Sequence, residues 1–146
     1  MEATDKKGER VRRTSKSDVN AQIDNLIIFN LEYYKSEGKA AIDRRIEELD
    51  REWDIERTLE MNAAAFAFTG SVLAAVANKR WIILPAIVGA FLAQHAIQGW
   101  CPPVLWFRKM GVRTRPEIDR EKYALKALRG DFDQVRDSDQ AWAAVN

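Results

Sequence analysis

Two long uncharged stretches, separated by a short polar link, dominate the pattern of hydrophobic and polar positions along the chain. Residues 61–77 contain no Lys, Arg, Asp or Glu, and residues 81–98 contain none either. A helix needs about 20 predominantly apolar residues, with roughly 17 as a lower limit, to cross the hydrocarbon core of a bilayer. The link at 78–80 is short enough to force an antiparallel arrangement. The pattern therefore predicts an all-α protein with a two-span transmembrane helical hairpin over 61–98.

The alternative is a buried helical hairpin inside a soluble bundle. Both stretches are apolar on every face, so a soluble fold would have to cover them completely. The flanking segments offer too few apolar residues for that, although self-association could supply the cover. Trp81 and Trp100 would stand about one bilayer thickness apart, at the two interfaces where indoles collect. The membrane hairpin is therefore the favoured interpretation.

Amphipathic patterns before the hairpin predict cytoplasmic helices over 18–60. Apolar positions recur there at steps of three and four residues, and Gly38 is suited to dividing them into two helices. The second helix is expected to start near Lys39 and to continue into the uncharged stretch without a break. One apolar stripe at helical spacing is the surface that we expect to serve self-assembly or partner docking: Ile42, Ile46, Leu49 and Trp53.

The chain after the hairpin begins with two prolines that cannot continue a helix. Cys101 precedes Pro102 and is therefore expected in extended geometry. Residues 99–114 are interpreted as an interfacial segment. Its apolar side chains would face inward while Arg108 and Lys109 reach lipid headgroups.

The remaining segments are predominantly polar. A threonine followed three residues later by a glutamate predicts a cytoplasmic helix over 115–130, which Gly130 would end. Residues 131–146 are interpreted as a tail. Residues 1–17 mix basic and acidic side chains and are expected to form a flexible arm. No long apolar run follows their basic residues, so no secretory signal peptide is predicted.

The distribution of charge predicts an orientation in the membrane. Lys and Arg number 23 against 22 Asp and Glu, and this net charge of +1 does not favour nucleic-acid binding. Arginines and lysines flank the hairpin on both outer sides, whereas the link carries only Lys79 and Arg80. By the positive-inside rule, both termini are expected in the cytoplasm.

Small residues recur at four-residue spacing within both predicted spans. Small side chains let helix backbones approach closely, which drives association in lipid. The pattern predicts a homo-oligomer that packs through strips containing Ala67, Gly70, Ser71, Ala74, Gly89 and Ala93.

Cys101 is the sharpest chemical candidate, and it is the chain's single cysteine. A thiol at the membrane boundary could carry a persulfide, form an intermolecular disulfide or accept a fatty acyl chain, and the basic neighbours Arg108 and Lys109 would favour its thiolate. The alternative, which we favour, is a small buried residue at a helix end with no chemistry. One cysteine excludes an intrachain disulfide and any Cys-rich zinc site.

Three polar side chains fall near the cytoplasmic end of the second predicted span: Gln94, His95 and Gln98. Polar groups inside a span are functional candidates by default, and these could hydrogen-bond across an oligomer interface or line a channel formed by several copies. One histidine and one cysteine per chain argue against metal or haem ligation, so no metal and no other cofactor is expected. The sequence holds no phosphate loop, nucleophile elbow or paired-carboxylate motif, so no catalytic residue and no enzyme is predicted.

The residues after the second predicted span resemble those of a known family. Residues 99–103 read Gly-Trp-Cys-Pro-Pro, and residues 111–114 read Gly-Val-Arg-Thr. These segments are similar to the YgaP-like transmembrane-domain family, a bacterial domain of unknown function. Its members carry a glycine-x-cysteine-proline motif at the end of a transmembrane hairpin, followed by a glycine–hydrophobic–x–threonine step. The resemblance covers about residues 60–115.

The resemblance implies an oligomeric helical hairpin of the bacterial inner membrane. Some members of that family also carry a rhodanese domain, which transfers sulfane sulfur through a catalytic cysteine. This chain is expected to lack that domain, so no sulfurtransferase activity is carried over. The leading hypothesis is a non-enzymatic scaffold or interaction subunit that self-associates and presents cytoplasmic helices at the lipid bilayer. The alternative is a small membrane-anchored thiol carrier or redox protein that acts through Cys101.

Overall fold

The computed structural model describes residues 10–145. Within this range the chain forms α-helices and one 3₁₀ helix, with no strand, which confirms the predicted all-α class. The contacts divide the chain into two compact units. Unit 1 contains the segment up to Asn20 together with Trp53–Arg115, and unit 2 contains Ala21–Glu52 together with the segment from Pro116 onward.

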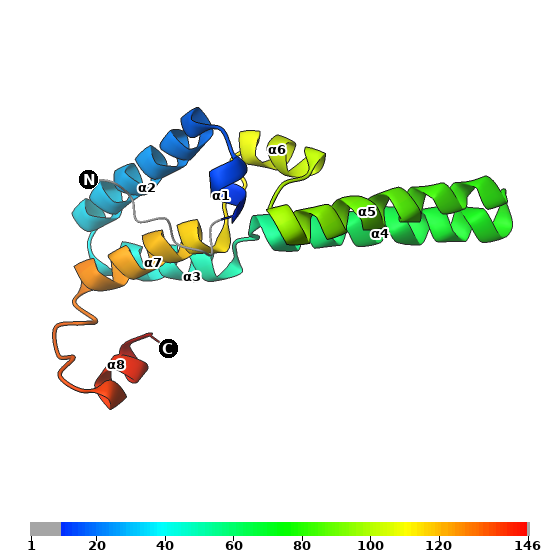
Figure 1. Ribbon diagram of the computed structural model, residues 1–146. Helices are drawn as coiled ribbons and strands as arrows, with labels where there is room; N and C mark the ends of the chain where they lie inside the picture. The colour runs from blue at the N-terminus through cyan, green and yellow to red at the C-terminus, as the bar shows by residue number, and fades with distance from the viewer. Residues whose placement is uncertain (1–9, 146) are drawn as a thin grey trace. The chain divides into compact units, whose positions relative to one another are not determined.

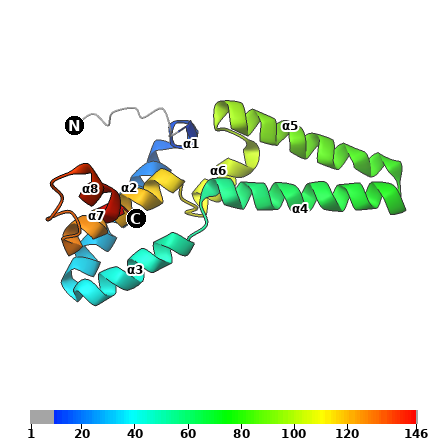
Figure 2. The same ribbon diagram turned by 90° about the horizontal axis from the view of Figure 1, so that it is seen from below.

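Unit 1 is built around two long apolar helices, α4 and α5, that lie side by side (Figures 1 and 2). The apolar segments within residues 39–76 and 79–98 are each long and apolar enough to cross a membrane. We call α4 and α5 the helix pair. Its elements and those around it are α1 (Arg10–Thr14), α4 (Ile55–Val76), the 3₁₀ helix η1 (Lys79–Ile82), α5 (Ile83–Gln98) and α6 (Pro102–Lys109).

Gly70 allows the close approach of the two helices of the pair. A Cβ atom at this position would lie 2.6 Å from Cδ of Pro85 and 3.0 Å from Cβ of Leu84. Asn78 turns the chain between the helices, because its side-chain oxygen accepts a hydrogen bond from the backbone N–H of Arg80 at 2.9 Å. The short link predicted at 78–80 is therefore the start of a capped 3₁₀ turn.

The structure differs from the predicted uninterrupted helix after Lys39, because residues 52–54 are not helical. Asp54 has extended backbone geometry, and its carboxylate accepts a hydrogen bond from the backbone N–H of Arg57 at 2.8 Å, so it caps a new helix. The N–H of Ile55 donates to the carbonyl of Arg113 at 2.8 Å. The hydrophobic periodicity runs across this junction, whereas the backbone hydrogen bonds do not.

The structure also differs from the predicted flexible arm over 1–17. Residues 1–9 of that arm lie outside the described range, but Arg10–Thr14 form α1. Val11 is buried and packs in a core cluster of unit 1, whose other members are Ile55, Leu59, Cys101, Val104 and Phe107. A single valine on a short polar segment gave too weak an apolar pattern to predict this docking.

The segment predicted to be interfacial, 99–114, contains α6. Pro102 and Pro103 occupy the first turn of this helix, where a missing N–H costs least. Arg108 does not extend toward headgroups, since it is buried. Its guanidinium donates hydrogen bonds to Oγ of Ser15 at 3.1 Å and Oδ1 of Asn20 at 2.8 Å. These two acceptors lie in the segment interpreted as an arm and just after it, which is why the sequence gave no sign of them.

Unit 2 has its own hydrophobic core, and that core uses most of the apolar stripe predicted to bind partners. Ile42, Ile46 and Leu49 are buried against Ile118 and Leu125. The stripe therefore covers another helix of the same unit instead of forming an open surface. The helices of this unit are α2 (Ser17–Glu37), which begins in unit 1, α3 (Lys39–Arg51), α7 (Arg115–Arg129) and α8 (Ser138–Val145).

The fourth residue of the predicted stripe, Trp53, belongs to unit 1 and remains 46% exposed. The guanidinium of Arg57 lies over its ring, 4.3 Å from the centroid.

The helix predicted over 115–130 corresponds to α7, which ends before Gly130, a residue with a φ of 95°. The predicted tail contains the short helix α8, whose Trp142 is exposed.

Candidate functional site

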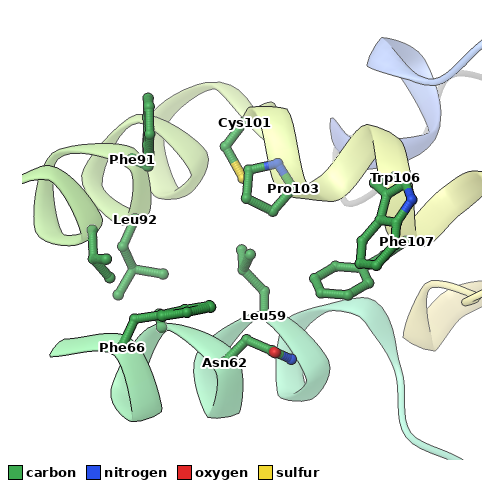
Figure 3. Close-up of a pocket in the computed structure, with 11 residues that line it drawn as sticks. Leu59, Asn62, Phe66, Phe91, Leu92, Cys101, Pro103, Trp106 and Phe107 are labelled. Atoms are coloured by element: carbon green, nitrogen blue, oxygen red, sulfur yellow. The ribbon is translucent and has the colours of Figure 1, made fainter. Parts of the chain in front are cut away.

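A cavity of about 310 Å³ lies at the end of the helix pair that is away from the η1 turn (Figure 3). Toward this end α4 and α5 diverge (Figure 2), and α6 follows the end of α5. We call this cavity the base cavity. Its walls are formed by Leu59, Asn62, Ala63 and Phe66 of α4, Val88, Phe91 and Leu92 of α5, Cys101, and Pro103, Trp106 and Phe107 of α6.

The walls of the base cavity are almost entirely apolar. Asn62 supplies the amide among them, and its side-chain NH₂ already donates to the backbone carbonyl of Thr58 at 2.8 Å. The NH₂ group is thus engaged by its own helix, and because the lining is otherwise almost entirely apolar, shape and apolar contact are the main means of recognition. An apolar pocket of this kind selects ligands that lose little by leaving water.

Cys101 forms part of one wall, and its sulfur points into the cavity (Figure 3). Its backbone is extended, with φ −157° and ψ 160°, as predicted for a residue before proline. Only 1% of the residue is exposed to solvent. Burial raises the pKa of the thiol above its ordinary value, and the negative charge of Glu56 acts in the same direction, against a lowering effect of the Val104 backbone N–H.

These features do not favour a thiolate at Cys101. A reactive thiol needs a lowered pKa and access to solvent, and this thiol has neither. Arg108, one of the two basic neighbours expected to favour the thiolate, instead donates to the side chains of Ser15 and Asn20 and to the carbonyl of Val112. The geometry therefore supports the structural interpretation of Cys101 over the thiol-carrier interpretation.

His95 is buried near the end of α5 and forms a pair with Glu56 in the first turn of α4. Nε2 of the imidazole lies 2.7 Å from Oε2 of Glu56, and the carboxylate accepts this hydrogen bond. Nδ1 of His95 has no hydrogen-bond partner among the described residues, so the imidazole and the Cys101 thiol are not hydrogen-bonded to each other. No cysteine–histidine nucleophile pair is formed by these two side chains.

Glu56 is a site residue that the sequence analysis missed, because it belongs to a run of alternating charges that is typical of a solvated helix. A signal was available. Two antiparallel helices place the start of one beside the end of the other, so an acid just before the uncharged stretch would lie near His95. The other two polar candidates do not join this pair: Gln94 is half-buried and Gln98 is exposed.

Helix α1 covers the C-terminal end of α5. The guanidinium of Arg10 donates to the carbonyl of Ala96, and the hydroxyl of Thr14 donates to the carbonyl of Gly99 at 3.2 Å. Both interactions satisfy carbonyl groups that a helix end leaves without intrahelical partners, and the cation also complements the negative end of the helix dipole. Gly99 itself adopts a left-handed conformation with φ 70°, and a Cβ there would lie 2.4 Å from Cβ of Arg10.

The predicted packing strips are divided between the inside and the outside of the helix pair. Gly70 is buried between α4 and α5, and Ala67 and Ala74 are half-buried. Ser71 is exposed, and its hydroxyl donates to the carbonyl of Ala67 at 2.8 Å. Gly89 and Ala93 are exposed on α5, and a Cβ at Gly89 would meet nothing within 4 Å. The α5 strip is thus the one that remains open.

Comparisons of the chain with protein-family models, with curated proteins and with solved structures found no match. The relation to the YgaP-like transmembrane-domain family therefore stays a prediction from the motif at 99–114.

Proposed function

We propose that the chain is an integral membrane protein whose helix pair forms a two-span hairpin in the bacterial inner membrane. The hairpin anchors unit 2 at the cytoplasmic face, with both termini in the cytoplasm. In this role the protein is a non-enzymatic scaffold or interaction subunit that self-associates. Its cytoplasmic helices are presented to other proteins at the bilayer surface.

The observation that carries the proposal is the apolar outer surface of the helix pair. In the most apolar windows of its two helical segments, only 17% and 6% of the residues are buried, whereas the core helix of a soluble protein is mostly buried. Large apolar side chains that would face water in a soluble monomer include Phe66, Phe68, Val76, Ile82, Ile83 and Ile97. An exposed apolar surface of this extent is typical of a protein that meets lipid or another protein.

The charges flanking the helix pair support the orientation. Lys79 and Arg80 are the cationic residues of the turn, whereas Arg57 and Lys109 belong to a larger basic group at the opposite end. This asymmetry favours the turn on the outer side and the basic end in the cytoplasm. Unit 2 would then extend into the cytoplasm.

Unit 2 also offers apolar residues to a partner. Leu26, Phe29 and Tyr33 of α2 are each about half exposed or more, and they follow a spacing of three and four residues along one side of the helix. The rings of Phe29 and Tyr33 are stacked at 6.4 Å. This side of α2 replaces the buried α3 stripe as the surface through which we expect partners to dock.

Replacing Phe68 by lysine tests the membrane placement. Phe68 is 73% exposed, so Phe68→Lys should be harmless or solubilising in a soluble protein. Near the centre of a transmembrane helix, a lysine costs about 2.5–3.5 kcal/mol of insertion free energy. We expect carbonate-washed membranes to retain the wild-type chain and to lose a large part of the Phe68→Lys chain.

The matched control is Phe29→Lys, which places the same substitution on an exposed phenylalanine of unit 2, 63% exposed. It should leave membrane retention unchanged. Release of the wild-type chain by carbonate, or equal retention of Phe68→Lys and wild type, would count against the membrane hairpin.

A further inference from the structure

We propose that the base cavity holds part of one acyl chain of a membrane phospholipid. The inference rests on the proposed function, since it requires the helix pair to lie in lipid, and it assigns a ligand to the site at its cytoplasmic end. It does not involve a covalent bond to Cys101.

The volume and the lining of the base cavity fit a single hydrocarbon chain. At about 310 Å³ the cavity is at the small end of ligand pockets, which span roughly 300–1,000 Å³. A whole phospholipid would not fit, whereas part of one chain would. Because the lining is almost entirely apolar and the NH₂ of Asn62 already donates to the carbonyl of Thr58, water would find few hydrogen-bond partners inside.

The lining is continuous with the outer surface of the helix pair. Phe66, Phe91 and Trp106 line the cavity and are also 56%, 39% and 63% exposed, so the apolar wall passes without interruption from the inside to the outside. In a bilayer that outside surface would contact lipid tails. A lipid at this position can therefore insert one acyl chain into the cavity without exposing that chain to water.

A cation on α6, one helical turn after a residue of the cavity wall, suits a phosphate headgroup. Lys109 is exposed and lies three residues after Trp106 on α6, which puts both on the same side of that helix. Indole rings favour the boundary between hydrocarbon and headgroups, and lysine reaches from there to anionic phosphates. The pair would hold the headgroup outside while the chain occupies the cavity. These features favour a bilayer phospholipid over a second copy of this chain as the occupant.

Photo-crosslinking in vesicles tests the proposal. The full chain is reconstituted in phosphatidylethanolamine and phosphatidylglycerol vesicles containing phosphatidylglycerol with a diazirine on one acyl chain. Adducts are then mapped by mass spectrometry. Leu59 and Phe107 are only 5% and 9% exposed, so adducts on them require a chain inside the cavity. Adducts on Phe68, which is 73% exposed and outside the cavity, report ordinary surrounding lipid.

A larger side chain at Leu92 should exclude the lipid chain. Leu92 lines the cavity, as Figure 3 shows, so Leu92→Trp should lower adducts on Phe107 relative to those on Phe68 by roughly fivefold or more. Ile87→Trp is the matched control, because Ile87 is a similarly exposed aliphatic residue of α5 outside the lining. It should leave the ratio unchanged. Leu92→Phe, a smaller change, replaces Leu92→Trp if carbonate-washed vesicles do not retain the tryptophan variant.

The outcomes separate this proposal from the membrane placement. Labelling of Phe68 without labelling of Leu59 and Phe107 would overturn the acyl-chain site alone and would leave a second copy of the chain as the occupant. Equal Phe107 labelling in wild type and Leu92→Trp would also overturn it. Absence of labelling at Phe68, together with release of the chain by carbonate, would overturn the membrane hairpin itself.

Discussion

Cys101 lies where three features of the chain meet: the end of α5, the proline-led start of α6 and the wall of the base cavity. The residue before a proline avoids helical geometry, so an extended residue here separates the two helices. A small apolar side chain also belongs to the core cluster that contains Val104, while its sulfur faces the base cavity. Position and burial account for this cysteine without any thiol chemistry.

The alkylation of Cys101 should show a raised pKa. Because burial lifts the pKa above the ordinary value of 9.0, the folded chain holds less thiolate than the unfolded chain at any lower pH. Maleimide should therefore react more slowly with the folded protein than with the unfolded chain. As pH is raised, the rate for the folded protein should still increase at pH values where the rate for the unfolded chain has become constant. The stability that the neutral thiol contributes is present below the ordinary pKa and is lost as pH rises through the folded pKa.

The reference for this measurement is the same chain unfolded in detergent and urea, since it contains only one thiol. Cys101→Ser defines the background of the reaction. A folded-state pKa below the ordinary value would contradict the structural interpretation and favour a thiol carrier.

Whether the role of a residue could be predicted from the sequence depends on how far away in the sequence its partners lie. The extended geometry of Cys101 depends on its neighbour, so the sequence was sufficient to predict it. The burial of Arg108 depends on Ser15 and Asn20, and the role of Gly99 depends on Arg10. These partners are distant in sequence and polar, and a hydrophobic pattern carries no information about them.

At the scale of elements, the open strip on α5 bears on self-association. Gly89 and Ala93 are exposed, and Gly89 has free space around the position of a Cβ. If copies pack through this strip, Gly89→Leu should keep the monomer fold but hold neighbouring backbones apart. We expect the crosslinked dimer in vesicles to fall by about threefold or more, as separated backbones lose van der Waals contact.

Ala65→Leu supplies the comparison for this variant, because Ala65 is exposed on α4 and lies outside the predicted strips. Its dimer yield should match that of the wild type. Unchanged crosslinking of Gly89→Leu would show that copies associate through a different face or not at all.

Apolar periodicity located the helices better than it located their ends. The uncharged stretches predicted α4 and α5, since length and composition are properties of the local sequence. The break at 52–54 was missed because Asp54 competes for a backbone N–H by a single side-chain hydrogen bond. Ile42, Ile46 and Leu49 were correctly placed on one face of a helix, whereas Trp53 follows the end of that helix. The hydrophobic pattern of a single helix does not indicate whether its apolar face is covered by α7 or by another chain.

At the scale of the whole molecule, unit 2 contains a buried polar network. It joins α2 and α3, which precede the helix pair in the sequence, to α7, which follows it. Glu121 of α7 has no exposed side-chain surface, and it accepts hydrogen bonds from Arg45 of α3 at 2.8 Å and from Asn30 of α2 at 3.0 Å. Burial alone would lower the pKa of Arg45, but the hydrogen bonds of Glu121 and Glu48 raise it above its ordinary value.

Removing the carboxylate of Glu121 should unfold unit 2 without changing the proposed membrane insertion of the helix pair. Breaking a buried ion pair by deleting one partner costs about 3–5 kcal/mol, because the remaining charge stays buried without compensation. Trypsin should then cleave α3 and α7 of Glu121→Ala in vesicles much faster than in the wild type. The amount of chain retained after a carbonate wash should not change.

Glu48→Ala is the control, since Glu48 bonds the same Arg45 at 3.0 Å but its side chain is 59% exposed. An exposed ion pair contributes at most about 1 kcal/mol, so proteolysis should remain close to that of the wild type. If Glu121→Ala resisted trypsin as well as Glu48→Ala does, the buried pair would not be holding unit 2 together.

The division of unit 2 between two distant parts of the chain has a consequence during synthesis. The ribosome produces α3 first, then the long apolar helices, and only later α7, whose Ile118 and Leu125 cover Ile42, Ile46 and Leu49. Until α7 has emerged, the surface of these three side chains that Ile118 and Leu125 cover is open, although Leu31 and Tyr34 of α2 are already present. Nascent chains with uncovered apolar residues are prone to aggregate. In the proposed membrane placement, insertion of the nascent chain would therefore precede completion of unit 2, and a chaperone that shields α3 in that interval would raise the yield of folded protein.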